Sequence, residues 1–145
     1  MQNSNDILNK VLKGEHMAID LYGTYLDQDL PEDLKDEMKS IQADHQRHAA
    51  LLTEYIKKAG GTPTEGSGFG GWMAESMARI QTTFVPDVGE ILSQLYDGED
   101  KGLARSVQLS EDHLAETERS LLEPILSDEH DHLKTLDNLI KKYKH

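Results

Sequence analysis

The sequence predicts an all-α protein: a four-helix bundle in which a long crossover, carrying a short extra helix, joins the second and third helices. In four stretches, apolar residues recur at alternating steps of three and four, the spacing of one helix face. No stretch shows the strict alternation of a β-strand. A pattern of metal-ligand residue types also occurs twice at matched spacing. We expect residues 1–145 to form a single domain, with the crossover at about 60–86.

Bulk properties exclude several classes of function. The chain of 145 residues carries a net charge of −12 and has no cysteine. The charge argues against nucleic-acid partners and against anionic membrane surfaces. The lack of cysteine excludes disulfides, iron–sulfur clusters and thiolate-zinc sites. No segment approaches the ~20 apolar residues of a membrane span. Residues 1–6 do not lead into a secretory signal, so we expect a cytoplasmic location.

The first helix is expected to be capped by Ser4, Asn5 or Asp6. Its apolar stripe contains one carboxylate, which lies within the stripe instead of on the charged face beside it. The stripe consists of Leu8, Leu12, Glu15, Ile19, Tyr22 and Leu26. A turn over residues 27–31 follows, in which Pro31 starts the second helix.

The second helix has a longer apolar stripe, and two histidines occupy positions within it. The stripe consists of Leu34, Met38, Ile41, His45, His48, Leu52, Tyr55 and Ala59. Gly60 and Gly61 follow and can provide a left-handed cap that ends the helix.

The connection between the second and third helices is too long for a tight turn. Residues 60–71 are rich in glycine and predict a loop, and residues 72–83 are helix-like. A crossover of this kind lets the second and third helices run parallel. A phosphate-binding loop is the alternative for the glycines. However, no strand precedes them and no Lys-Ser/Thr pair follows.

The third helix is expected to start at residues 85–87, and its stripe is the weakest of the four. This stripe consists of Leu92, Tyr96, Glu99, Leu103 and Ser106. A turn near 112–117 leads to the fourth helix, where Pro124 should cause a kink or free a backbone carbonyl. The fourth stripe consists of Leu122, Ile125, Glu129, His132, Leu136, Leu139 and Tyr143.

Six residues of metal-ligand type occupy these stripes in matched register. Glu99 follows Glu15 by 84 residues (99 − 15), and the second ligand pair follows the first by the same interval (129 − 45 and 132 − 48). The six are Glu15, His45, His48, Glu99, Glu129 and His132. Unpaired charges are costly in a bundle interior, whereas a divalent cation neutralises carboxylates and binds neutral imidazoles.

If each of the six residues is considered alone, a structural role is the alternative to metal binding, because one histidine in an apolar stripe is usually a satisfied core residue. Six ligand types in matched register favour a metal site. Tyr22 and Tyr96 lie within two turns of the glutamates and are either packed core residues, hydrogen-bond partners of a ligand or electron donors. Other polar residues beside the stripes are interpreted as solvated or supporting: His16, Asp20, Asp44, Asp112, His113, Asp128, His130 and Asp131.

The chain resembles the ferritin-like superfamily, with a glutamate on helices 1 and 3 and ligand pairs on helices 2 and 4. Residues 8–15 look like the first helix of a bacterioferritin, and residues 125–133 look like its fourth. The glycine-rich crossover and the stretch 98–100 are more similar to an uncharacterised family of bacterial four-helix bundles with the same fold.

The resemblance implies two metal ions, most simply iron, with zinc or manganese as alternatives. Glu15 and Glu99 would be terminal ligands, Glu129 a bridging one, and His48 and His132 would each bind one metal. His45 departs from the pattern, because it stands where the family usually has a second bridging glutamate. We therefore expect two unequal metal positions.

The first functional hypothesis is a small metalloprotein that oxidises Fe(II) with dioxygen or peroxide, in iron handling or oxidative-stress defence. A second is a non-catalytic bundle with a structural metal such as zinc, or an interaction module. A third is a di-iron hydroxylase, which would need an apolar substrate channel. The chain shows no fifth helix for a storage cage, so we expect a monomer or a small homo-oligomer.

Overall fold

The computed structural model describes residues 3–66 and 87–144, and over these residues the chain forms four α-helices and no strand. The predicted all-α class is confirmed. The helices are α1 (Ser4–Leu26), α2 (Glu32–Lys58), α4 (Val88–His113) and α5 (Glu116–Tyr143). The predicted helix over 72–83 and most of the crossover lie outside the described residues.

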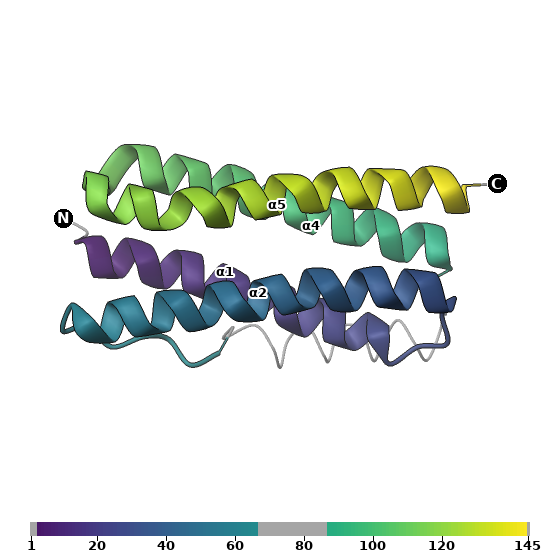
Figure 1. Ribbon diagram of the computed structural model, residues 1–145, viewed down its shortest axis with the longest axis horizontal. Helices are drawn as coiled ribbons and strands as arrows, with labels where there is room; N and C mark the ends of the chain where they lie inside the picture. Colours follow the sequence, from purple (N-terminus) through teal and green to yellow (C-terminus); the bar gives the residue numbers. More distant parts are fainter. Residues whose placement is uncertain (1–2, 67–86, 145) are drawn as a thin grey trace.

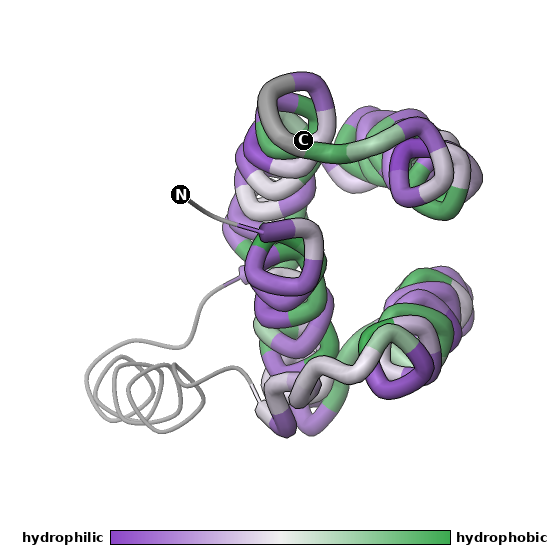
Figure 2. Tube along the Cα trace, turned by 90° about the vertical axis from the view of Figure 1, so that its left-hand side faces the viewer, coloured by the Kyte–Doolittle hydropathy of each residue, from purple (hydrophilic) through white to green (hydrophobic). Residues whose placement is uncertain are grey.

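The four helices lie side by side as a bundle (Figure 1). Helices α1 and α5 run in one direction and α2 and α4 in the other, so the predicted parallel course of α2 and α4 is confirmed. α1 packs against α2 and α4, and α5 packs against α4 and α2. Each helix therefore contacts two antiparallel neighbours, and the four surround a common interior, seen end-on in Figure 2.

α1 is capped one residue earlier than predicted. The side chain of Asn3 accepts a hydrogen bond from the backbone N–H of Asp6 at 2.9 Å, and the Asp6 carboxylate accepts from the backbone N–H of Asn3. Such a reciprocal capping box needs an acceptor at the third helical position. Among the successive candidate caps, only Asn3 places a carboxylate there, whereas Ser4 would place Ile7.

α2 starts after Pro31 and ends in the predicted left-handed glycine cap. Gly60 has φ 82°, its N–H donates to Lys57 O, and the N–H of Gly61 donates to Ile56 O at 2.9 Å. These two bonds form a Schellman motif and satisfy carbonyls that the helix end leaves open.

The connection between α4 and α5 consists of residues 114–115, within the predicted turn region. Asp87 caps α4 by accepting a hydrogen bond from the N–H of Glu90 at 2.8 Å. α5 continues as helix on both sides of Pro124. None of the four described helices combines the length and apolar character that a membrane span requires.

The interior contains two apolar clusters, one toward each end of the bundle. The first includes Tyr22, Met38, Leu92 and Leu136, and the second includes Leu8, Leu52 and Leu122. Among the described residues, six of the nine buried polar side chains are the candidate ligands. The polar layer therefore lies in the middle of the bundle, where all four helices contribute to it.

Candidate metal centre

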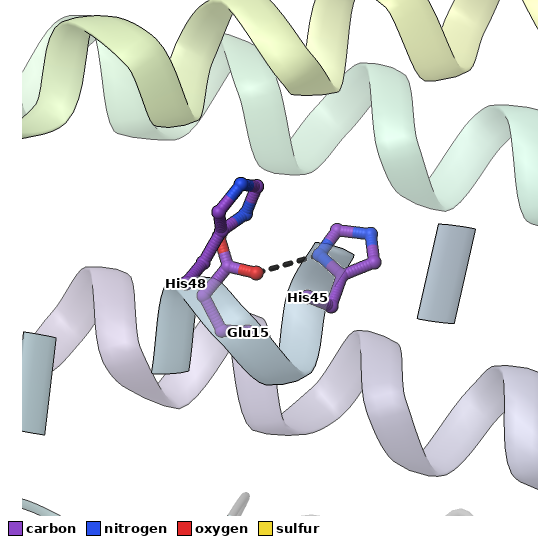
Figure 3. Close-up of side chains that lie close together, drawn as sticks. All are labelled: Glu15, His45 and His48. Carbon is purple, nitrogen blue, oxygen red and sulfur yellow. Dashed lines mark hydrogen bonds and ion pairs between the residues drawn. The ribbon is translucent and has the colours of Figure 1, made fainter. Parts of the chain in front are cut away.

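The structure brings the six candidate ligands together in the middle of the bundle, and each is at most 6% exposed. Figure 3 shows the part of the centre that comes from α1 and α2, whose side chains point toward the α4–α5 pair. Two groups have ligand atoms within 4.8 Å of one another. They are Glu15/His45/His48 and His45/Glu99/His132, so the two groups share His45.

His45 lies between two glutamates that come from different helices. Its Nδ1 is 2.5 Å from Glu15 Oε2, and its Nε2 is 2.6 Å from Glu99 Oε1. Ionised carboxylates only accept hydrogen bonds, so both ring nitrogens donate and the ring is an imidazolium. Burial alone would lower the pKa of His45, but the hydrogen bonds to the two carboxylates raise it to about 10.

The two outer histidines are held by aspartates from the opposite helix pair. His48 Nε2 donates to Asp128 Oδ2 at 2.8 Å, and His132 Nε2 donates to Asp44 Oδ2 at 2.8 Å. In both rings Nδ1 faces inward, 3.4 Å from a glutamate oxygen. A carboxylate that accepts from the outer nitrogen fixes the ring and makes the inner nitrogen a better ligand.

Asp44 and Asp128 are expected from the sequence to be solvated or supporting residues, and the sequence pattern does not single out Arg47. The structure gives the aspartates the supporting role. Arg47 donates to Asp44 at 2.8 Å and to Asp128 at 2.9 Å, so it joins the two outer contacts. The signal in the sequence is the aspartate immediately before each ligand pair, at the same interval of 84 residues (128 − 44).

Glu129, predicted to bridge, is buried but belongs to neither of the two groups. Burial and the charge of Glu15 raise the pKa of its carboxyl group to about 9. Glu99 has the opposite shift. Burial would raise its pKa, but the neighbouring His132 and His45 lower it to about 2. The carboxyl group of Glu99 is therefore ionised at neutral pH, whereas that of Glu129 is protonated.

The two tyrosines differ in their relation to the centre. Tyr22 is buried, and its hydroxyl donates to Glu99 Oε1 at 3.0 Å. Burial and the charge of Glu99 raise the pKa of this phenol. Tyr96 is half-buried and packs against the first apolar cluster, and none of its contacts within the described residues joins it to a candidate ligand. Among the residues placed beside the stripes, Asp20, His130 and Asp131 are exposed.

The donor set fits metal ions. Four of the five buried side-chain atoms without a hydrogen-bond partner in the described residues belong to candidate ligands: Glu15 Oε1, His48 Nδ1, Glu129 Oε2 and His132 Nδ1. His48 Nδ1 faces Glu15 Oε1 at 3.4 Å, and neither atom has a hydrogen-bond partner in the described residues. Two ligands bound tetrahedrally to one metal at about 2.0–2.1 Å lie about 3.3–3.4 Å apart. A cation between them would satisfy both atoms.

The contacts of His45 with Glu15 and Glu99 are shorter than the distance of about 3.3–3.4 Å between two ligands of one metal. At 2.5 and 2.6 Å they are hydrogen bonds, and metal binding there would require loss of the ring protons and longer distances. Nitrogen and carboxylate ligands together suit iron, zinc and manganese.

Comparison with known proteins gives two similarities. Residues 3–112 match the family described as "Domain of unknown function (DUF2383)", a match that ends before the second ligand pair. The chain is also similar to a solved structure described as "Crystal structure of ferritin like, diiron-carboxylate proteins from Bacillus anthracis str. Ames". That similarity has 27% sequence identity and a TM-score of 0.70, and it covers 94% of each chain. No curated protein matches the sequence.

Proposed function

The chain belongs to the family described as "Domain of unknown function (DUF2383)" and has a ferritin-like fold, and from this premise we propose that it binds two metal ions and oxidises Fe(II) with dioxygen or peroxide. The fold predicted from the resemblance is confirmed. The similar structure is described as a diiron-carboxylate protein at 27% identity, which supports iron as the metal.

One observation carries the proposal: two groups of buried ligand atoms share His45, and four buried polar atoms of the candidate ligands have no hydrogen-bond partner among the described residues. Polar atoms buried without partners each cost about 1–3 kcal/mol. A cluster of them at the centre of the bundle therefore points to ligands that contact metal. Glu15 and His48 would hold one ion, Glu99 and His132 the other, and Glu129 would contribute a further carboxylate.

The chemistry divides between metal and protein. Iron, when bound, supplies the electrons that reduce dioxygen or peroxide. The protein fixes the ligands: Asp128 and Asp44 hold the rings of His48 and His132, and Tyr22 holds Glu99 through its hydroxyl. Burial excludes bulk water from the centre, which strengthens each of these electrostatic interactions. We propose a monomer or small homo-oligomer that acts without nucleic acid or membrane.

The test measures metal content and aerobic Fe(II) oxidation in the same variants. Glu129→Ala should lose most metal uptake, whereas Asp131→Ala, two residues away on the exposed face, should keep it. Wild type should oxidise Fe(II) faster than buffer, and Glu99→Ala should remove that acceleration. Equal metal content in the first two variants would contradict the metal centre. Normal metal content with oxidation at the buffer rate would instead favour the structural-metal alternative.

A further inference from the structure

An apolar cavity of about 330 Å³ lies between α1 and α4 and ends at the metal-ligand cluster. The surface of its lining is mainly apolar, and Val11, Met17, Leu21 and Leu95 contribute to it. The innermost lining residues are buried and belong to the candidate centre: Glu15, His45, Glu99 and Glu129. Cavities of roughly 300–1,000 Å³ with apolar walls and a few polar groups are typical ligand sites.

Three helix-interior glycines line the outer part of the cavity: Gly14, Gly98 and Gly102. Glycine within a helix costs up to about 1 kcal/mol relative to alanine. Close helix contact does not require these glycines. A Cβ at Gly14 or Gly102 would meet nothing within 4 Å, and one at Gly98 would make only an ordinary contact at 3.7 Å. What the three glycines provide is open space at the entrance.

The two ends of the cavity differ in charge. At the inner end, Glu15 Oε1 and Glu129 Oε2 are buried without hydrogen-bond partners in the described residues. At the entrance lie Lys101 and Arg105, both exposed. Lys101 is paired with Asp97 at 2.9 Å, with Asp100 beside it. Arg105 forms no ion pair within the described residues.

This distribution orients a bound molecule. In the metal-free protein, three carboxyl groups and the single imidazole of His45 line the inner end, so this end disfavours an anionic head. The apolar walls favour an uncharged chain. The unpaired guanidinium of Arg105 at the entrance favours a carboxylate. The cavity volume of about 330 Å³ is at the lower end of the range for ligand sites, so an unbranched chain of about six to ten carbons suits it better than a bulky ligand.

We propose that this cavity binds a medium-chain monocarboxylate, with its carboxylate at Arg105 and its chain between α1 and α4, directed toward the ligand cluster. Binding at this site requires no metal, so the proposal goes beyond the proposed function. An experiment can contradict either one without contradicting the other. It would place the apolar end of an organic molecule beside the candidate centre.

Calorimetric titration of the full chain with hexanoate, octanoate and decanoate tests the cavity. Each added methylene should lower Kd about fourfold, the fold-change that corresponds to about 0.8 kcal/mol per buried methylene, until the cavity is filled. Octanol should bind more weakly than octanoate by about two- to fivefold, the range of an exposed ion pair. Absence of binding, or a Kd that does not change with chain length, would overturn the proposal.

Two variants locate the site. Gly102→Leu should fill the entrance and weaken octanoate binding at least tenfold. Ala104→Leu introduces the same side chain on the exposed face of the same helix and should have no effect. Because Gly102→Leu adds a better helix former in open space, its thermal stability should not fall, so lost binding would not reflect unfolding. Arg105→Gln should remove the preference for octanoate over octanol.

A second copy of the chain could cover the same groove, and the same variants distinguish this outcome. Sedimentation of wild type and Gly102→Leu should give the same mass. A wild-type dimer that Gly102→Leu dissociates and octanoate leaves intact would show that a partner copy occupies the groove, and the proposal would be wrong.

Discussion

His45 is the one candidate ligand at which the two helix pairs differ, since Glu129 stands at the matching position 84 residues later (129 − 45). Two divalent ions carry +4, and Glu15, Glu99 and Glu129 supply only −3. The loaded centre would keep one positive charge in a poorly screened interior, which is costly. The structure places one nitrogen of His45 toward each glutamate, but a neutral imidazole has only one lone pair to offer.

Because the three glutamates do not balance the charge of two divalent ions, the wild type should bind divalent metal in two unequal steps. His45→Glu should add the missing negative charge and tighten the second step by about tenfold or more. Calorimetric titration with Zn²⁺ measures both steps, and Asp131→Ala serves as a control that should reproduce the wild type. Two equivalent wild-type sites, or no tightening in His45→Glu, would contradict the charge argument.

The raised pKa of His45 also predicts how the free energy of unfolding of the metal-free protein depends on pH. The raised pKa of His45, about 10 against an ordinary 6.5, means that its contribution is full below pH 6.5 and is lost as pH rises through 10. The raised pKa of Glu129, about 9 against 4.5, acts in the same direction. Between these limits the folded state holds protons that the unfolded state has released.

The free energy of unfolding of the metal-free protein should therefore fall between pH 6.5 and 9. Urea denaturation with a chelator present, at a series of pH values, measures this slope. Glu129→Gln should make this slope smaller, because an amide has no proton to lose and only the contribution of His45 remains. Stability that is constant or that rises over this interval would show that the folded state holds neither the imidazolium of His45 nor the protonated carboxyl group of Glu129.

At the scale of elements, Gly60 and Gly14 have opposite backbone requirements. Gly60 ends α2 with φ 82°, a conformation that side chains rarely adopt, whereas Gly14 lies inside α1 with open space beside it. Gly60→Ala should lower the free energy of unfolding by about 1–2 kcal/mol. Gly14→Ala should raise it by up to about 1 kcal/mol. Denaturant unfolding measures both, and changes of the same sign would contradict this account.

The helices were predictable because each stripe repeats over many residues, and the six ligand candidates were found because they interrupt those stripes. The start of α1 was harder to predict, because several neighbouring residues can cap a helix. Residues 3–6 are all of capping type, and only the position of Asp6 relative to Asn3 decides among them. The hydrogen bonds of His48 with Asp128, and of His132 with Asp44, join helices far apart in the sequence, and no single helix pattern contains them.

At the scale of the whole molecule, the polar centre separates the two apolar clusters, so neither cluster extends through the bundle. Without metal, this middle layer depends on hydrogen bonds among charged groups. The resemblance supplied the two-metal expectation, but it could not show that His45 would be shared by both ligand groups or that Glu129 would stand apart. Both facts depend on how four helices pack around one layer.

Metal should therefore stabilise the entire bundle. A ligand at 100 times its Kd adds about 2.7 kcal/mol to the native state. For a chain of this size that corresponds to roughly 5–11 °C in Tm. Calorimetry of the metal-loaded protein before and after chelator should show a loss of this order, and Glu129→Ala should show almost none. An unchanged wild-type Tm would mean that metal does not contribute to the fold.

The reciprocal aspartate–histidine contacts have an evolutionary consequence. Asp44 of the first helical hairpin holds His132 of the second, and Asp128 of the second holds His48 of the first. Even the helix caps Asn3 and Asp87 keep the interval of 84 residues (87 − 3). An exchange of equivalent contacts across a two-fold relation is what a symmetric homodimer of hairpins would leave after gene duplication and fusion. Fusion would also have allowed position 45 to become histidine while position 129 remained glutamate, a difference that no homodimer could have acquired.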